Sequence, residues 1–470
     1  MTEVKFGTDG WRGIIADSFT FDRLKLVARA VVSVLYGMHP QTEIVVGYDR
    51  RFLSPEFARA IALEIQAMGI DVLLANQYAP TPALSWSAFT RQGLGALIIT
   101  ASHNPPHYSG LKIKGAFGGS VSKEVTDRVE AKLRENSPPL SLARTATISE
   151  FDPWVAYCQQ LQTKVDIGLI QKFIDSQQLT IISDAMHGCA ASGLPRLLER
   201  PIPELRSTSD PLFGGCAPEP LAVNLTELMQ AVPNASTALA VGFAFDGDSD
   251  RIACIDRDGT FLSSQILIPI LTEHLVKNRQ KTGAFIKTIS GSDLLPKVAE
   301  LYGLPVQETP VGFKYLAEKI LAQPTLIAGE ESGGIGYGDH IPERDALLSA
   351  LYVLEAMCST GQNLGQIYRQ LQKQVNFYPV YDRVDLHLSD MATRQRVEQR
   401  LAHQPPQAIA NLAVRSITNP DGFKFRLEND SWLLVRFSGT EPVLRLYCEA
   451  GDRATVQAVL HWMKNWAEQI

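Results

Sequence analysis

Long apolar runs are missing from this sequence of 470 residues, and their absence limits what the protein can be. No stretch approaches the ~18 apolar residues that a membrane-spanning helix needs. The first residues, MTEVKFGTDG, contain neither the basic nor the apolar region of a signal peptide. The net charge is −6 and no long basic run is present, so we expect neither nucleic acid nor a membrane as a partner. Together these absences predict a cytoplasmic protein.

The sequence is also short of cysteine pairs. Its six cysteines are scattered, and none forms a C-x-x-C motif. We therefore expect reduced thiols and no structural zinc site. A G-x-S-x-G motif is absent as well, which argues against serine chemistry of the α/β-hydrolase type.

What the sequence does contain is a repeated alternation of short β-branched runs and amphipathic helical patterns. A strand is predicted at 43–49, followed by a helix that starts at Ser54 and Pro55. The same succession returns at 179–188 and 283–303, which indicates α/β layers with mostly parallel sheets. The last segment has strands WLLVRF and VLRLYCEA before a closing helix, and we predict a compact α+β unit there.

Three loop-like stretches divide the chain, and its length suggests three or four domains. They lie at 134–153, 255–263 and 373–384. From them we predict four domains, comprising residues 1–147, 148–257, 258–374 and 375–470.

The segment DGDSDR places Asp246, Asp248 and Asp250 at alternate positions on one tight turn between two predicted strands. Three carboxylates so close together repel each other, and a hard cation with oxygen ligands removes the repulsion. The turn is not an EF-hand, because Arg251 stands where such a loop has glycine. We interpret it as a Mg²⁺ site; the alternative is a solvated acidic turn.

The segment VRFSGTEPVLR follows a strand with small residues that let backbone N–H groups approach an anion. Ser438 and Thr440 add hydroxyl donors around Gly439. Arg436 adds a guanidinium fork suited to phosphate. A hairpin turn with a surface arginine explains this segment equally well.

Four other side chains could bind a substrate, although each has an ordinary structural explanation. Glu330 and Ser332 lie on the glycine-rich loop AGEESGGIGYGDHIPERD, where they could meet sugar hydroxyls, or the loop could be solvated. Lys314 could reach a phosphate or be a surface lysine. Arg12 could bind an anion or pair with an acid.

Ser102 lies in TASHNPPHYSGLKIKG, directly after a predicted apolar strand. A serine that carries a phosphoryl group needs a cation to neutralise charge and a lysine nearby. The DGDSDR turn and Lys112 could supply these. The alternative is a serine that only satisfies the N–H groups of its own turn.

The motifs TASHNP, DGDSDR, GEESGG and RFSGTEP, in this order, resemble the α-D-phosphohexomutase family, and FGTDGWRG at the start fits too. The resemblance covers essentially the whole chain. It implies four domains around a central cleft, three similar α/β domains with mixed sheets and a C-terminal α+β domain. Each domain would contribute one loop to the active site.

The resemblance also implies roles for these residues. Ser102 would be a phosphoserine that exchanges its phosphoryl group with a hexose phosphate, through a glucose 1,6-bisphosphate intermediate. Ser102 and the three aspartates would bind Mg²⁺. The remaining predicted catalytic residues are Lys112, Arg251, His103 and Arg12. Glu330 and Ser332 would contact the sugar, and the loop from Arg436 to Thr440 the phosphate that is not reacting.

The sugar loop resembles the phosphoglucomutase version of the motif, because Gly334 stands where relatives that prefer mannose or glucosamine phosphates carry histidine. Lys314, within GFK, fits the same branch. The resemblance then predicts that His340 and Arg344 do polar work near the substrate. We expect a phosphoglucomutase, with a phosphomannomutase, a hexose 1,6-bisphosphate synthase and a non-catalytic sugar-phosphate binding protein as alternatives. The oligomeric state stays open.

Overall fold

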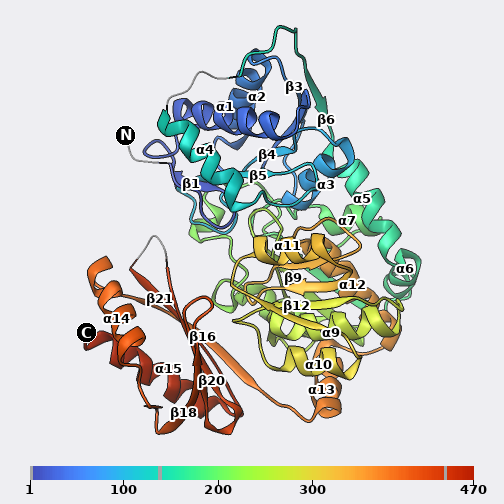
Figure 1. The fold of residues 1–470 in the computed structure, drawn as a ribbon. Helices are drawn as coiled ribbons and strands as arrows, with labels where there is room; N and C mark the ends of the chain where they lie inside the picture. Colours follow the sequence, from blue (N-terminus) through green and yellow to red (C-terminus); the bar gives the residue numbers. More distant parts are fainter. Residues whose placement is uncertain (1–3, 136–139, 439–441) are drawn as a thin grey trace.

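The structure, a computed structural model, describes residues 4–135, 140–438 and 442–470, and these form four β-sheets with helices packed on them (Figure 1). We call each sheet with its helices a domain, numbered I to IV in chain order. Figure 1 shows domain I at the top, domains II and III below it, and domain IV to the lower left. This is the four-domain architecture that the sequence predicts.

Domain I contains a mixed sheet in the order β1-β5-β4-β2-β3-β6, in which β1, β5 and β4 are antiparallel neighbours and the rest are parallel. Its strands are β1 (Trp11–Ile14), β2 (Glu43–Tyr48), β3 (Asp71–Ala75), β4 (Ala96–Ile99), β5 (Tyr108–Lys114) and β6 (Ile148–Phe151). Its helices are α1 (Phe21–Met38), α2 (Ser54–Ala67), α3 (Thr81–Arg91) and α4 (Lys123–Glu135). Because β6 pairs with β3, this sheet extends past residue 147.

Domain II contains the sheet β11-β10-β9-β7-β8, in which β9 and β10 form the hairpin that carries DGDSDR. Its strands are β7 (Leu179–Asp184), β8 (Glu204–Leu205), β9 (Leu239–Phe245), β10 (Ile252–Ile255) and β11 (Phe261–Leu262). Its α-helices are α5 (Pro153–Lys164), α6 (Ile167–Asp175), α7 (Gly193–Leu198) and α8 (Thr226–Ala231). Short 3₁₀ turns are η1 (Phe213–Gly215), η2 (Ala222–Asn224) and η3 (Val232–Asn234). Strand β11 lies beyond the boundary predicted at residue 257.

Domain III contains the sheet β13-β12-β14-β15, which is parallel except for β15. Its strands are β12 (Ala284–Thr288), β13 (Val306–Thr309), β14 (Thr325–Gly329) and β15 (Ile335–Tyr337). Its helices are α9 (Ser264–Lys277), α10 (Leu294–Leu301), α11 (Phe313–Ala322), α12 (Ala346–Thr360) and α13 (Leu364–Val375).

Domain IV is built on an antiparallel sheet in the order β16-β21-β20-β19-β18-β17. Its strands are β16 (Val380–His387), β17 (Ala408–Ile409), β18 (Leu412–Thr418), β19 (Phe423–Leu427), β20 (Trp432–Phe437) and β21 (Val443–Ala450). Helices α14 (Met391–His403) and α15 (Arg453–Glu468) and the turn η4 (Glu428–Asp430) complete it. The predicted α+β unit and its closing helix are therefore confirmed.

The predicted strands and helices form where the local pattern indicates them. Strands β9 and β12 are buried at every position, as expected for strands covered on both faces by helices. Helix α2 starts at Ser54 with Pro55 in its first turn, as predicted. It ends at Ala67, earlier than the apolar pattern suggests, and Gly69 just beyond it has φ +83°, which continues no helix.

One continuous apolar core runs through domains I, II and III, whereas domain IV has a separate core. The shared core joins buried residues such as Leu84 of domain I, Phe243 of domain II and Leu351 of domain III. In domain IV, the helices α14 and α15 cover one face of the sheet around residues such as Val435. Domains I to III are thus expected to behave as one body. Within the described residues, no helix has the length and apolar character needed to cross a membrane.

The other face of the domain IV sheet packs against domain III. Trp432, Leu434 and Tyr447 form a small apolar cluster with Ile289 of domain III. Next to this cluster, the buried Lys424 donates a hydrogen bond to the carbonyl oxygen of Ile289 at 2.6 Å. Burial lowers the pKa of Lys424 to about 8, and the positive charge of a neighbouring lysine adds to the effect.

We predict that this buried lysine makes stability depend on pH. Between pH 8 and 10.5 the unfolded chain keeps the Lys424 proton that the folded chain has released, so the free energy of unfolding rises with pH. The gap from 8 to 10.5 corresponds to about 3.5 kcal/mol, at about 1.4 kcal/mol per pH unit. Urea denaturation of Lys424→Met should lack this rise.

The exposed Lys464→Met in the same domain is the matched control and should keep the wild-type slope. An unchanged slope in Lys424→Met would show that the lysine stays charged throughout this pH range.

Candidate active site

Ser102 lies on a loop that is held in an unusual conformation at the end of β4. Its φ of 52° is in the left-handed region, and its side chain is buried. The hydroxyl oxygen of Thr100 accepts a hydrogen bond from the Ser102 N–H at 2.9 Å. The buried guanidinium of Arg51 donates hydrogen bonds to the carbonyl oxygens of Ser102 and Asn104, each at 2.6 Å. Because these bonds fix the backbone, the Ser102 hydroxyl is presented in one direction.

The DGDSDR turn lies directly against this loop. The Ser102 hydroxyl donates a hydrogen bond to Asp246 Oδ2 at 2.7 Å. The other oxygen of Asp246 accepts the backbone N–H groups of Asp250 and Arg251, at 3.0 and 3.1 Å. A side chain at Gly247 would collide with the carbonyl oxygen of Ser102, so only glycine allows this close approach.

The three aspartates of the turn fit a metal ion. Each offers one carboxylate oxygen, and these oxygens lie within 4.8 Å of one another and are buried. Asp248 Oδ1 and Asp250 Oδ1 have no hydrogen-bond partner among the described residues. Burial raises the pKa of Asp246 well above its usual value, and the other two carboxylates add to the rise. Unpartnered carboxylate oxygens in a buried cluster are what a divalent cation requires.

Lys112 of β5 reaches the same cluster from domain I. Its amino group lies 2.7 Å from both Asp248 and Asp250, and 2.8 Å from Asp9 near the N-terminus. Burial alone would lower the pKa of Lys112, but the three carboxylates outweigh it and raise the pKa above its usual value. The lysine is therefore a fixed positive charge at the three-aspartate cluster.

His103 follows Ser102 and contributes an imidazole to the same loop. Its Nδ1 lies 3.2 Å from the Ser102 hydroxyl oxygen. Burial lowers the pKa of His103 well below its usual value, and the nearby cations, Arg251 and Arg12 first among them, lower it further. The ring is therefore neutral near pH 7 and can accept a proton or a hydrogen bond.

The sugar loop predicted from the sequence follows β14 and touches the metal turn. The backbone N–H of Ile252 donates a hydrogen bond to the carbonyl oxygen of Gly333 at 3.1 Å. Arg344 lies over Gly334 so closely that a side chain at position 334 would collide with it. The Arg344 guanidinium lies 2.6 Å from Asp250 and 3.8 Å from Glu330, so it joins the sugar loop to the metal turn.

Domain IV forms the opposite wall with basic side chains. Arg436, Arg445 and Arg383 come from β20, β21 and β16 and line one cavity together with Tyr447. Arg383 also forms an ion pair with Glu331 of the sugar loop at 3.3 Å. Ser438 is described next to this wall, whereas Gly439 and Thr440 lie outside the described residues.

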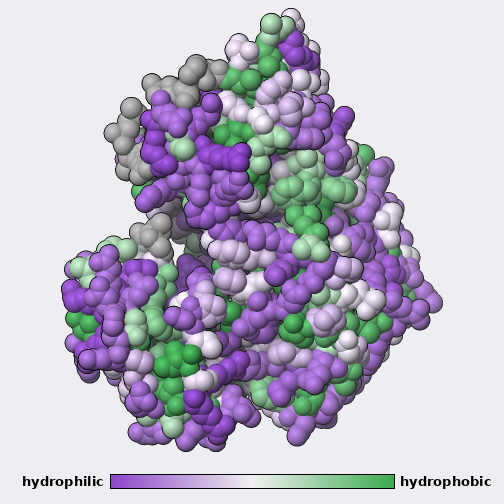
Figure 2. Space-filling model, in the orientation of Figure 1, coloured by the Kyte–Doolittle hydropathy of each residue, from purple (hydrophilic) through white to green (hydrophobic). Residues whose placement is uncertain are grey.

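The cavity between these walls brings together predicted residues from all four domains. It is lined by Arg12, His103, Arg251, Lys314, Glu330, Ser332, Arg344 and Arg436, among others. In the space-filling view the surface is indented between domain I above and domain IV below, and mostly hydrophilic residues flank the indentation (Figure 2). Basic groups line one wall of the cleft, and the candidate metal cluster lies beside Ser102. The cleft can therefore hold a substrate that has an anionic group at each end.

Four family models match the chain in succession. They are described as phosphoglucomutase/phosphomannomutase α/β/α domains I, II and III, over residues 3–139, 155–259 and 263–375, and the C-terminal domain, over residues 393–464. A crystal structure from Thermus thermophilus, described as that of a phosphomannomutase, is 32% identical with a TM-score of 0.86 and covers 99% of both chains.

The chain belongs to the α-D-phosphohexomutase family.

Two further relatives match this phosphohexomutase over almost its full length. A phosphoglucosamine mutase of Halorhodospira halophila is 29% identical, over 97% of this chain and 95% of the relative. A phosphoglucomutase/phosphomannomutase of Thermococcus kodakarensis is 28% identical, over 95% of this chain and 94% of the relative. Phosphohexomutases are intramolecular phosphotransferases, so the chain is an enzyme of the isomerase class.

The structure does not bring His340 of this phosphohexomutase into the cleft. The His340 side chain is fully buried and lies 3.0 Å from Asp345, with its ring stacked on Trp86 at 5.5 Å. It is not among the residues that line the cavity. That His340 does polar work near the substrate stays a prediction, and in the structure its side chain packs between α3 and the start of α12.

Several cleft residues of the phosphohexomutase were not predicted. Asp9 belongs to FGTDGWRG, in which only Arg12 was considered, and Arg445 ends the quoted segment VRFSGTEPVLR. Both residues lie within motifs that the sequence shows, so the sequence could have indicated them. Arg383 and Tyr447 gave no such signal, because only the pairing of β16 and β20 with β21 shows where they lie.

We predict that Asp248→Asn weakens Mg²⁺ binding to this phosphohexomutase. The amide loses the negative charge of one of three clustered carboxylates, and we expect an increase in Kd of at least about tenfold. Isothermal titration of the protein with Mg²⁺, without substrate, measures this directly. The exposed Asp258→Asn on the next turn is the matched control. Equal affinities of wild type and Asp248→Asn would exclude the cluster as the metal site.

Proposed function

We propose that this phosphohexomutase is a Mg²⁺-dependent phosphoglucomutase, which interconverts glucose 1-phosphate and glucose 6-phosphate. The observation that carries the proposal is the Ser102 hydroxyl, which lies 2.7 Å from Asp246 of a buried three-aspartate cluster. The next residue, His103, lines a cleft that has three arginines on its far wall. Phosphoryl transfer depends mainly on positioning and on neutralising charge, and this site is organised for both.

In the proposed reaction, Ser102 carries the phosphoryl group. A sugar hydroxyl attacks the phosphorus and gives up its proton, the bond between phosphorus and the serine oxygen breaks, and the serine oxygen takes up a proton, which yields a hexose 1,6-bisphosphate. This intermediate turns over in the cleft. The serine oxygen then attacks its other phosphate, the bond between that phosphorus and the sugar oxygen breaks, and the sugar oxygen takes up a proton. We assign to His103, whose Nδ1 lies 3.2 Å from the serine oxygen, the role of accepting the serine proton in that step.

Asp246, Asp248, Asp250 and Ser102 would hold the Mg²⁺ ion. Bound there, the ion would neutralise negative charge on the phosphoryl group during transfer. Lys112 lies 2.7 Å from both Asp248 and Asp250, and we assign it the stabilisation of the same group. Arg12 and Arg251, which line the cavity near Ser102, would contact the reacting phosphate.

The far side of the cleft would bind the rest of the substrate. Glu330 and Ser332 would accept and donate hydrogen bonds to sugar hydroxyls. Arg436 and the loop of Ser438, Gly439 and Thr440 would hold the phosphate that is not reacting, with Lys314 nearby. The cleft wall is basic here, and guanidinium groups match phosphate geometry.

The preference for glucose rests on Gly334. A histidine at this position characterises relatives that prefer mannose or glucosamine phosphates, and here Arg344 occupies the space that such a side chain would need. A second candidate, a phosphomannomutase, is favoured by the description of the structural relative from Thermus thermophilus, which is 32% identical. A hexose 1,6-bisphosphate synthase uses the same residues and differs only in how readily the intermediate leaves.

We predict that the purified protein converts glucose 1-phosphate to glucose 6-phosphate when given Mg²⁺ and a trace of glucose 1,6-bisphosphate. Mannose 1-phosphate and glucosamine 1-phosphate should turn over more slowly in parallel assays. Ser102→Ala should abolish turnover, because it removes the phosphoryl carrier. Comparable rates with mannose phosphate would make the enzyme a broad phosphohexomutase, and net release of bisphosphate would favour the synthase.

We also predict that Gly334→Ala lowers kcat/KM for glucose 1-phosphate by about tenfold, or about 1.4 kcal/mol. The added methyl group displaces the Arg344 guanidinium from Asp250 and Glu330. Gly37→Ala, at a position with open space around it, is the control. Wild-type kcat/KM in Gly334→Ala would mean that the Arg344 position does not matter for turnover.

A further inference from the structure

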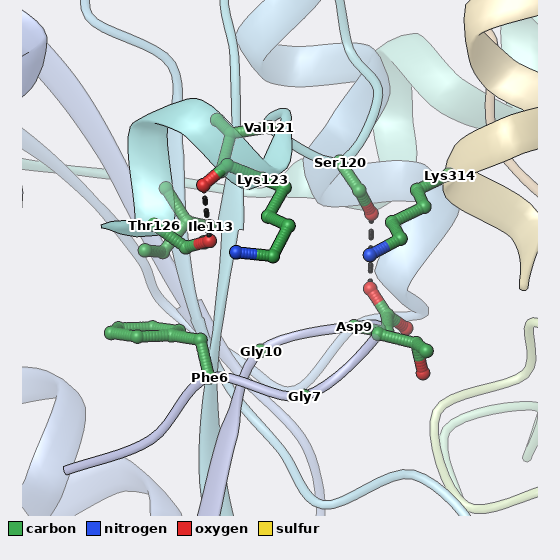
Figure 3. Close-up of a pocket in the computed structure, with 11 residues that line it drawn as sticks. Phe6, Gly7, Asp9, Gly10, Ile113, Ser120, Val121, Lys123, Thr126 and Lys314 are labelled. Atoms are coloured by element: carbon green, nitrogen blue, oxygen red, sulfur yellow. Dashed lines mark hydrogen bonds between the residues drawn. The ribbon is translucent and has the colours of Figure 1, made fainter. Parts of the chain in front are cut away.

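Asp9 is a carboxylate that contacts three cationic side chains. It lies 2.8 Å from the amino group of Lys112 and 3.2 Å from that of Lys114, and it forms an ion pair with Arg344. The Ser120 hydroxyl donates to it at 3.0 Å. Figure 3 shows Asp9 and Ser120 pointing toward each other, with the Lys314 side chain reaching the same region.

The N-terminal loop holds Asp9 rigidly in this position. The backbone N–H of Gly7 donates to the carbonyl oxygen of Gly10 at 2.8 Å and closes a turn around Asp9. Gly10 has φ +99°, and a side chain there would collide with the carbonyl oxygen of Leu111, next to Lys112. The turn can therefore lie against β5 only because residue 10 is glycine.

Asp9 is charged at this position. Burial acts to raise its pKa, but Lys112, Lys114 and Arg344 together lower the pKa well below its usual value. The carboxylate is therefore a permanent counter-ion, because three cations surround it on three sides.

The three cations do not depend on Asp9 equally. Lys114 also pairs with Glu343, and Arg344 also pairs with Asp250 at 2.6 Å and lies 3.8 Å from Glu330. Lys112 has three carboxylate partners, and two of them, Asp248 and Asp250, are candidate metal ligands. A divalent cation on the aspartate cluster competes for their charge, which leaves Asp9 as the one partner of Lys112 outside the metal turn.

We propose that Asp9 is the positioning residue for Lys112: it holds the lysine at the edge of the aspartate turn and keeps it from competing with Mg²⁺ for Asp248 and Asp250. The inference rests on the proposed function and adds a residue to it. Asp9 acts through Lys112 and Arg344 and does not itself react.

The test uses the full-length Asp9→Asn variant in two measurements. In the mutase assay we expect kcat to fall about 100-fold with KM changed less than about threefold, because a partner of a reacting group typically contributes 10–100-fold. In titration with Mg²⁺ alone we expect about a tenfold higher Kd, since Lys112 then pairs more tightly with Asp248 and Asp250. Asp17→Asn, an exposed residue of the same N-terminal segment, is the control that should change neither value.

A double-mutant cycle separates this role from a general effect of charge. In a Lys112→Met background, Asp9→Asn should change the Kd for Mg²⁺ by less than about threefold, because the lysine through which it acts is gone. If the full tenfold loss persists there, Asp9 acts on the metal by its own charge and the proposal is wrong. An unchanged kcat in Asp9→Asn would overturn it as well.

Asp9→Glu keeps the proposal testable if the asparagine variant folds poorly. This variant retains the charge, so we expect it to recover most of the Mg²⁺ affinity and part of kcat. Equal losses in both variants would indicate a purely steric role and would contradict the proposal. The Mg²⁺ titrations need no substrate, so they distinguish failure of this inference from failure of the proposed phosphoglucomutase activity.

Discussion

The rest of the structure depends on the burial of three carboxylates on one turn between β9 and β10. Asp246, Asp248 and Asp250 are each almost fully inaccessible to solvent. Buried like charges are costly unless opposite charges or hydrogen bonds compensate them. The compensation comes from other segments of the chain, since Lys112 belongs to domain I and Arg344 to domain III. The charge balance of a single turn therefore requires three domains to meet at one point.

The distribution of apolar surface explains how this meeting point can be both precise and open. Domains I to III share one core, so Ser102, the metal turn and the sugar loop are fixed relative to one another. Domain IV has its own core and contacts domain III through a small aromatic cluster and a few polar groups. The residues assigned to phosphoryl transfer thus lie in domains I to III, which share the apolar core. The arginines assigned to the distant phosphate lie on the part with fewer contacts.

Local sequence was a good guide to elements and motifs, and a poor guide to which side chains meet. The β-branched runs and the helix start at Ser54 and Pro55 predicted strands and helices correctly, because periodicity and the proline signal act within a few residues. The place of His340 could not be predicted from its polar motif, because its ring is buried against Trp86 of a distant helix. Asp9 was overlooked because its importance comes from Lys112 and Arg344, which are about 100 and more than 300 positions away.

By itself, the sequence determined the four-part α/β organisation, the motifs of Ser102 and of the three aspartates, and the membership of a family, because each depends on residues that are neighbours in the chain. Only the tertiary structure decided that Asp9 joins three cations, that Arg51 holds the Ser102 backbone and that Arg383 links domain IV to the sugar loop. Such contacts depend on how the four sheets pack together. A charged side chain gains little free energy from an oppositely charged partner until folding removes both groups from water. The packing of the domains, and not the local sequence, therefore decides which charged residues pair.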